Sequence, residues 1–115
     1  MSELAALSLA GNPAGFFVYT LAPSIAACDS EARMFCPAIG IMEDPVSGNA
    51  HAMLAAYLWD LGQFGKNSTS FIGRQGRQMK RPGEVSVRLE IDQGSLAAAH
   101  IGGTAVIVSE GTLAL

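Results

Sequence analysis

One short stretch of this chain combines acids, a predicted helix start and a glycine, and these residue types can build a site for a small anion. It spans residues 40–51 and has the sequence GIMEDPVSGNAH. The backbone N–H groups of Gly48, Asn49 and Ala50 fall where the helix should begin. There they have no intrahelical acceptor, and the helix dipole favours negative charge. Because Gly48 has no side chain to keep a ligand away, the stretch predicts a cradle for a carboxylate or phosphate group.

Two acids stand just ahead of this cradle. Glu43 and Asp44 are followed by Pro45, which fixes its own φ and biases Asp44 towards an extended conformation. A carboxyl group in an apolar loop is expected to have a raised pKa and to exchange protons. Asp44 is therefore our candidate acid/base residue, and Glu43 is expected to be structural or solvated. An alternative stays open, in which Ser47 or Asn49 only caps the helix and Asp44 only pairs with its positive end.

Other reactive residue types in the chain are expected to be structural. His51 falls in the first helical turn, near enough to contact a ligand, but a neutral, hydrogen-bonded histidine is the commoner state there. His100 lies on a predicted strand. Cys28 and Cys36 form no CxxC motif and no zinc-type cluster, so we expect two reduced thiols and no catalytic role for Cys36. The basic stretch from residue 74 to 81 is expected to be the solvated edge of a hairpin, with a rim for an anionic substrate as the second interpretation.

The element that must position the cradle is a helix. Its apolar residues follow the i, i+3, i+4, i+7, i+8, i+11 spacing of one helical face. They are Ala50, Met53, Leu54, Tyr57, Leu58 and Leu61. The opposite side is also mostly apolar, so we expect protein to enclose the helix nearly all round, with Met53, Tyr57 and Trp59 in the core. Gly62 stands where a left-handed residue would end the helix.

Strands are predicted on both sides of this helix. The expected strands are residues 15–21, 32–36, 69–72, 85–91, 95–100 and 104–108, with a loop over residues 38–47. The strictest alternation of apolar and polar residues covers 85–91, and the turn after it is expected at Asp92-Gln93-Gly94. Together these elements predict an α+β fold, with a mostly antiparallel sheet rolled around one buried central helix.

The composition excludes several other classes of protein. A chain of 115 residues, half of them hydrophobic and 15% charged, is long enough for one domain over residues 1–115 and too hydrophobic for disorder. A formal net charge of −3 argues against nucleic-acid binding. Neither a signal-peptide pattern nor an apolar run of about 20 residues occurs. We therefore expect a cytoplasmic protein that does not bind membranes.

The motif around Asp44 resembles one known family. Ala32-Arg33-Met34-Phe35, then Pro37 and Gly40-Ile41, lead to Glu43-Asp44-Pro45-Val46-Ser47-Gly48-Asn49-Ala50. This is similar to the pattern R-M-F-x-P-x-x-G-x-x-E-D-P-x-T-G-S-A of the PhzF-like family, named for phenazine biosynthesis. Further matches follow in the family's order, so the resemblance covers nearly the whole chain. They are Gly15–Tyr19 upstream and, downstream, Gln75-Gly76, Arg81-Pro82-Gly83, Gly102–Val106 and Glu110-Gly111.

The resemblance implies the fold of diaminopimelate epimerase. Relatives of this kind have two similar halves, each a sheet rolled around a helix, with the active site between them. The family includes an isomerase that moves a proton within a dihydro-hydroxyanthranilate by acid/base chemistry, without a metal or an organic cofactor. The resemblance implies that Asp44 lines this site, and that Gly48, Asn49 and Ala50 help to hold the substrate carboxylate.

Departures from the family pattern limit what the resemblance implies. Ser47 stands in place of the usual threonine, and Asn49 in place of the usual serine. The chain matches most of the C-terminal half, whereas the family's principal base, a glutamate, comes from the first half. We therefore expect an isomerase half that is inactive without a complementary half, and that pairs with an N-terminal half or forms a homodimer to cover apolar surface and strand edges. The alternative is a non-catalytic domain that self-associates or binds small carboxylates.

Overall fold

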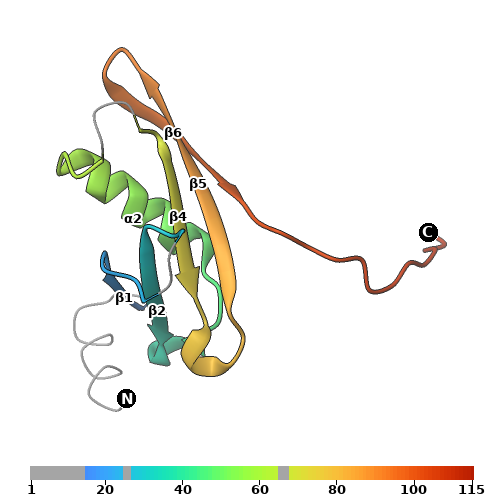
Figure 1. Cartoon of the computed structure of the whole chain (residues 1–115). Coiled ribbons are helices and arrows are strands. Elements are labelled where there is room, and N and C mark those ends of the chain that lie inside the picture. Colours follow the sequence, from blue (N-terminus) through green and yellow to red (C-terminus); the bar gives the residue numbers. More distant parts are fainter. Residues whose placement is uncertain (1–14, 25–26, 65–67) are drawn as a thin grey trace.

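The computed structural model describes residues 15–24, 27–64 and 68–115. Within these ranges, six strands form one sheet that curls around one α-helix (Figure 1), which confirms the predicted α+β class. The elements are β1 Phe16–Thr20, β2 Ser30–Cys36, β3 Ile41–Asp44, α2 Gly48–Asp60, β4 Ser70–Gln75, β5 Gly83–Asp92 and β6 Ser95–Gly102, with short 3₁₀ helices at Pro37–Ile39 and Arg77–Met79.

The sheet has the strand order β1-β2-β4-β5-β6, and β3 pairs with β2 beside this path. β2 and β4 are parallel, with Ser30 opposite Gly73, and all the other pairings are antiparallel. The parallel pair requires a crossover connection, and that connection carries β3 and α2. The crossover thus sets the start of α2 directly after the end of β3, which is where the candidate site lies.

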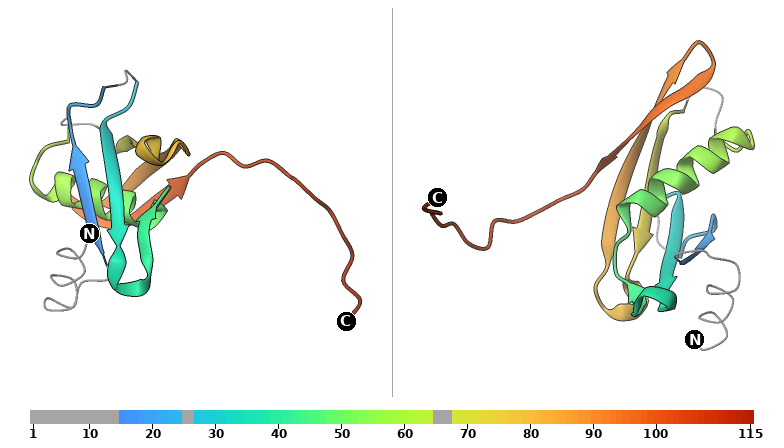
Figure 2. Two further views of the ribbon diagram at one scale, coloured as in Figure 1. Left: turned by 90° about the horizontal axis from the view of Figure 1, so that it is seen from below. Right: turned by 180° about the vertical axis from the view of Figure 1, so that it is seen from behind.

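The core lies between α2 and the concave side of the sheet, as the two views of Figure 2 show. Its buried members are Leu54, Ala55 and Leu58 from the helix and Phe71, Val85, Val87 and Leu89 from the sheet. In β5, every second residue from Val85 to Leu89 is buried and those between them are exposed, as its alternation predicted. The turn at Asp92-Gln93-Gly94 is confirmed too, because Gln93 and Gly94 have φ values of 49° and 79°, which fit a two-residue hairpin turn.

The predicted helix is present, but the expected burial of one of its faces is wrong. Met53, Tyr57 and Leu61 are exposed by 64%, 55% and 50%. The buried side is rotated around the axis and consists of Ala50, His51, Leu54, Ala55 and Leu58. Since the sheet covers α2 on one side only, Met53 and Tyr57 lie outside the core, and Trp59 is half-buried against it. Gly62 has the predicted left-handed conformation, with φ 71°.

Two further expectations are corrected by the structure. The predicted loop over 38–47 contains β3, which pairs with β2 at Met34–Asp44 and Cys36–Ile41 after a turn with Gly40 at φ 83°. The predicted strand over 104–108 does not form. The sheet's last pairing ends at Gly102 opposite Ser86, and residues 103–115, here called the C-terminal arm, extend away from the body (Figure 1).

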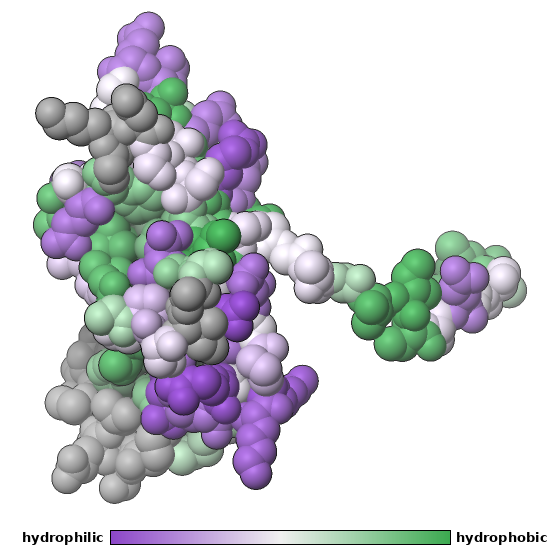
Figure 3. Space-filling view, viewed as in Figure 1, coloured by the Kyte–Doolittle hydropathy of each residue, from purple (hydrophilic) through white to green (hydrophobic). Residues whose placement is uncertain are grey.

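The arm makes the molecule less compact than an ordinary domain of its length. The radius of gyration is 16.4 Å, against about 13 Å for a compact chain of this length. Figure 3 shows the arm as a separate projection with a hydrophobic middle. Among the described residues, no helix has both the length and the apolar character that crossing a membrane requires.

Candidate active-site wall

Three residues connect the end of β3 to the first turn of α2. Ser47 occupies the N-cap position in an extended conformation, yet its side chain does not cap the helix. Its hydroxyl instead donates to Asp44 Oδ2 at 2.5 Å. The first helical hydrogen bond runs from His51 N to Ser47 O at 3.2 Å. Within the described residues, no acceptor meets the N–H groups of Gly48, Asn49 or Ala50. Capping of the helix by Ser47 or Asn49 is therefore wrong, whereas the other part of that alternative, in which Asp44 only pairs with the positive end of the helix, stays a prediction.

A buried glutamine holds this connection in place. Gln75, at the end of β4, is only 2% exposed. Its Nε2 donates to the carbonyl oxygen of Asp44 at 2.6 Å and to Ser47 Oγ at 3.1 Å. Its Oε1 accepts from Ser47 N at 3.0 Å and lies 3.1 Å from His51 Nε2. One side-chain amide thus links β3, the helix start and the first helical turn. It fixes the backbone of Asp44 and also Ser47, whose hydroxyl donates to the Asp44 carboxylate.

The same glutamine sets the state of His51. Because Gln75 Oε1 can only accept, Nε2 of His51 must donate, which leaves Nδ1 without a proton. His51 is fully buried and meets Phe17 edge to face, with ring centroids 5.0 Å apart. Burial lowers the pKa of His51, and the hydrogen bond to Gln75 raises it by less. His51 is therefore a neutral structural residue, as expected from the sequence, and it takes no part in a surface site.

Glycines allow this close packing at two positions. A Cβ on Gly73 would lie 2.2 Å from His51 Nδ1, so β4 can pass over the histidine ring only as glycine. Gly76 has φ 89°, and a Cβ there would lie 2.2 Å from the carbonyl oxygen of Arg81 and 2.7 Å from that of Pro45. The β4–β5 connection therefore presses directly against the loop after Asp44, which gives a physical reason for glycine in the Gln75-Gly76 pair.

The start of α2 lies beside the end of β6. A Cβ on Gly48 would be 3.4 Å from Ile101 Cγ2, so the glycine borders the side chain of a neighbouring strand. Next to it runs an open groove of about 520 Å³. Its lining residues are Val46, Pro82, Gly83, Glu84, Val85, Ile101, Gly102, Gly103 and Thr104. The groove is lined by backbone, glycine, aliphatic side chains and the polar residues Glu84 and Thr104, so its surface is about equally polar and apolar.

Ion pairs fix the strands around this wall. Arg33 and Glu43 form a two-point pair, with Nε–Oε1 at 2.7 Å and Nη2–Oε2 at 3.2 Å. Glu43 is therefore structural, as predicted. Arg77 pairs with the buried Glu31 at 2.5 Å. This bond, together with hydrogen bonds from Ser24, lowers the pKa of Glu31.

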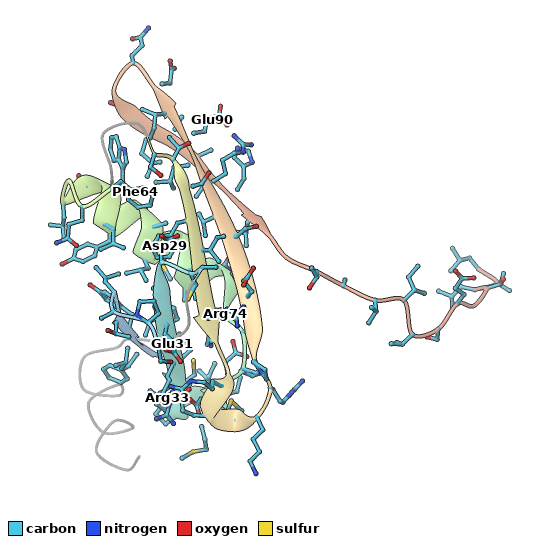
Figure 4. All side chains as sticks on the ribbon, in the orientation of Figure 1. Asp29, Glu31, Arg33, Phe64, Arg74 and Glu90 are labelled. Carbon is cyan, nitrogen blue, oxygen red and sulfur yellow. The ribbon has the colours of Figure 1, made fainter. Side chains whose placement is uncertain are left out.

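The basic stretch lies largely at a hairpin edge, as the sequence indicated. Arg74 pairs with Glu84 at 3.1 Å, and Arg77 pairs with Glu31. Lys80 and Arg81 are exposed on the connection between β4 and β5. Figure 4 labels Glu31 and Arg33, both from β2, and Arg74 from β4.

The cysteines do not have the surroundings of nucleophiles. Burial raises the pKa of the Cys36 thiol, and the negative charge of Asp44 raises it further. Burial is also the main reason why the pKa of Cys28 is raised. Neither Cys28 nor Cys36 forms a disulfide, and both thiols stay protonated at neutral pH, because only a lowered pKa makes a thiolate available. In the described part of the chain, no group of three or more His, Cys, Asp and Glu side chains is placed to hold a metal ion.

Comparison with known proteins identifies relatives of this chain. Residues 5–111 match the model of the PhzC-PhzF family, described as phenazine biosynthesis-like protein. An uncharacterized isomerase of Clostridium acetobutylicum is 35% identical over 103 residues, which are 88% of this chain and 34% of the relative. The uncharacterized isomerase YddE of Escherichia coli is 36% identical over 110 residues, 94% of this chain and 36% of the relative. A human phenazine biosynthesis-like domain-containing protein is 35% identical over 93% of this chain and 31% of the relative.

A solved structure shows the same fold. The crystal structure of a PhzF-family phenazine biosynthesis protein from Bacillus anthracis superposes with a TM-score of 0.73 over 88% of this chain and 35% of that chain, at 22% identity. The chain spans about one third of the length of the curated relatives it matches.

Proposed function

Because this chain belongs to the phenazine biosynthesis-like, or PhzF-like, isomerase family, we propose that it forms one wall of a cofactor-independent isomerase site acting on a small carboxylate. Asp44 is the acid/base residue of this wall. The N–H groups of Gly48, Asn49 and Ala50 bind the substrate carboxylate. The observation that carries the proposal is the juxtaposition of a positioned carboxyl group with a helix start whose N–H groups have no acceptor in the described residues.

The geometry supports this division of roles. Ser47 donates to one carboxylate oxygen of Asp44, and Gln75 Nε2 donates to the carbonyl oxygen of Asp44. A fixed carboxyl group needs little reorganisation when it gives or takes a proton. When a proton leaves the carbon next to a carboxylate, negative charge develops on the carboxylate oxygens, and N–H groups at a helix start are suited to stabilise it.

The second wall is assigned to a complementary half of the family fold. In the PhzF-like family that the sequence resembles, the principal base is a glutamate of the first half of the protein. In this proposal, that glutamate takes the proton from one carbon of the substrate and Asp44 assists the transfer from its own side. The site closes only when both halves meet, and this chain alone is expected to be inactive.

Deuterium exchange tests the proposal. The chain is incubated in D₂O with a dihydro-hydroxyanthranilate, alone and together with the N-terminal half of a relative, and deuterium uptake is followed by mass spectrometry and NMR. We expect uptake and isomerisation only in the presence of the complementary half, and their loss in Asp44→Asn. The matched control is Asp92→Asn, an exposed turn residue that should leave turnover unchanged. Unchanged turnover in Asp44→Asn would refute the assignment.

The alternative is a non-catalytic domain that binds small carboxylates. It is favoured by the same free N–H groups at Gly48, Asn49 and Ala50, which can bind an anion without any chemistry. Carboxylate binding without deuterium exchange under every pairing would support it.

A further inference from the structure

The side-chain amide of Gln75 fits its surroundings in only one orientation, and this orientation fixes the ring of His51. Its oxygen faces the backbone N–H of Ser47 at 3.0 Å, and its nitrogen faces the carbonyl oxygen of Asp44 at 2.6 Å. Turning the amide over would set donor against donor and acceptor against acceptor. Because the same oxygen lies 3.1 Å from His51 Nε2, that ring nitrogen carries the proton. The other nitrogen, Nδ1, is left as an acceptor.

Nδ1 of His51 is an acceptor that is shielded from solvent. His51 is fully buried, and among residues 15–24, 27–64 and 68–115 no hydrogen-bond partner meets its Nδ1. Buried polar atoms without a partner are rare in folded proteins, because they lose their bonds to water and gain nothing in return. The ring therefore needs a donor on this side.

Ser30 is placed to be that donor. It lies on β2 opposite Gly73 of β4, it is fully buried, and its hydroxyl also has no partner in the described part of the chain. A Cβ on Gly73 would lie 2.2 Å from His51 Nδ1 and 3.2 Å from Ser30 Oγ, so both atoms border the same small space beside the glycine. The third such atom in the described residues, Arg74 Nε, belongs to a side chain that pairs with Glu84. Because successive strand residues point to opposite faces of a sheet, Arg74 lies on the other face from Gly73.

We infer that Ser30 and His51 are positioning residues of the candidate site, with the Ser30 hydroxyl donating to His51 Nδ1. From there the donors all point in one direction. His51 Nε2 donates to Gln75 Oε1, and Gln75 Nε2 donates to Ser47 Oγ at 3.1 Å. The Ser47 hydroxyl, which accepts from Gln75, has its own proton directed to Asp44 Oδ2. A buried serine of β2 thus helps to fix which oxygen of Asp44 is engaged, and leaves Oδ1 as the oxygen that exchanges a proton with a substrate.

Ser30 acts through the tautomer of His51. If the proton moved to Nδ1, Nε2 would become an acceptor and would face the acceptor Gln75 Oε1. The amide of Gln75 would then shift, and the hydrogen bond from Ser47 N and the orientation of the Ser47 hydroxyl would be lost with it. A donor at Nδ1 disfavours this state, because a ring nitrogen that accepts a hydrogen bond cannot carry a proton.

Ring ¹⁵N NMR of the full chain, labelled at its histidine nitrogens, tests the hydrogen bond. The exposed His100, which pairs with Glu90, is the internal control in the same spectrum. We expect the Nε2-protonated tautomer at His51, and an Nδ1 signal that moves towards that of a nitrogen without a donor in Ser30→Ala. Ser86→Ala, the same replacement at an exposed position, should leave the His51 signals unchanged. A proton on Nδ1 in the parent chain, or identical His51 signals in the parent and Ser30→Ala, would overturn the inference.

Amide hydrogen exchange tests the positioning role without any substrate. In Ser30→Ala we expect the Ser47 amide, which donates to Gln75, to exchange about tenfold faster, as for the loss of one hydrogen bond. The amides of the central strand β5 should exchange as they do in Ser86→Ala. No change at Ser47, or an equal acceleration at Ser47 and throughout β5, would overturn the positioning role, since the second result means that Ser30 only stabilises the fold.

The positioning role rests on the function proposed for Asp44, and the two can fail separately. Failure of the proposed function would appear in the deuterium-exchange assay with substrate, where Asp44→Asn would keep full turnover. Failure of the positioning role would appear in the His51 ring signals and in the exchange of the Ser47 amide, which are measured on this chain alone.

Discussion

Replacing Gln75 with leucine should remove the hydrogen bonds that hold the candidate site in place. The side chain is buried and takes part in four hydrogen-bond contacts, with Asp44 O, Ser47 Oγ, Ser47 N and His51 Nε2. Leucine has a similar size but neither donates nor accepts. The substitution therefore leaves two donors and two acceptors without their partner, one of them the fully buried Nε2 of His51 and the other three partly buried.

The magnitude can be worked out from these contacts. A typical intramolecular hydrogen bond contributes about 0.5–1.5 kcal/mol net, so four contacts give about 2–6 kcal/mol. The contacts share one amide and are not independent, so we expect a loss of about 3–4 kcal/mol in the free energy of unfolding. This is a large share of the roughly 5–15 kcal/mol that stabilises an ordinary domain.

Urea unfolding followed by tryptophan fluorescence measures this loss. Trp59 is the only tryptophan and packs at the rim of the core, so its emission reports on the core. The control is Gln78→Leu, the same replacement at an exposed position, which should change stability by less than about 0.5 kcal/mol. Equal stabilities of the two variants would refute the structural role assigned to Gln75.

Three further predictions concern the surroundings of the site. Burial lowers the pKa of His51 below its ordinary value of 6.5, so between the two pKa values only the unfolded chain takes up this proton. The free energy of unfolding should therefore fall as the pH drops below about 6.5, by up to about 1.4 kcal/mol per pH unit. Urea midpoints between pH 7.5 and 5.5 measure this fall, and an equal slope in His51→Leu would contradict the prediction. Gly73→Ala should lower the free energy of unfolding by about 1–3 kcal/mol or more, since its Cβ would lie 2.2 Å from His51 Nδ1. Gly111→Ala, which has open space around it, should leave stability unchanged. Thermal melts compare the two variants, and equal melting temperatures would count against the close contact. Glu31→Gln should lower the free energy of unfolding by about 1–2 kcal/mol, because it removes a charged partner of the half-exposed Arg77. In the parent chain the lowered pKa of Glu31 makes stability fall as the pH drops below 4.5, and the variant should lose this part of the fall. An unchanged decrease of stability below pH 4.5 in urea titrations would contradict this.

Local patterns in the sequence were sufficient to predict most of the elements. The period-2 alternation from Val85 to Ile91 depends only on which side of a strand is buried, and the helix over 48–60 depends on a long apolar segment. The choice of the buried helix face did not follow from the sequence. Met53 and Leu54 are both apolar, and only the position of the sheet decides that Leu54 is inside.

Features that depend on contacts distant in sequence were not predicted. β3 is four residues long and exists because β2 is beside it. The strand expected over 104–108 is absent because no edge of the body reaches it. The role of Gln75 was also missed, although its position on β4 gives a signal, since Phe71, Gly73 and Gln75 alternate on the buried side of that strand. A polar residue on an apolar face indicates a buried hydrogen-bond network.

The most direct test of the site is a titration of the ¹⁵N-labelled chain with benzoate, followed through the backbone amide signals. Benzamide, a neutral molecule of the same shape, is the matched ligand control. We expect the largest benzoate-dependent shifts at Gly48, Asn49 and Ala50, with millimolar affinity (about −4 kcal/mol), and no such shifts with benzamide. Shifts confined to Lys80 and Arg81, or no saturable shift at the helix start, would contradict the assignment of this wall to carboxylate binding.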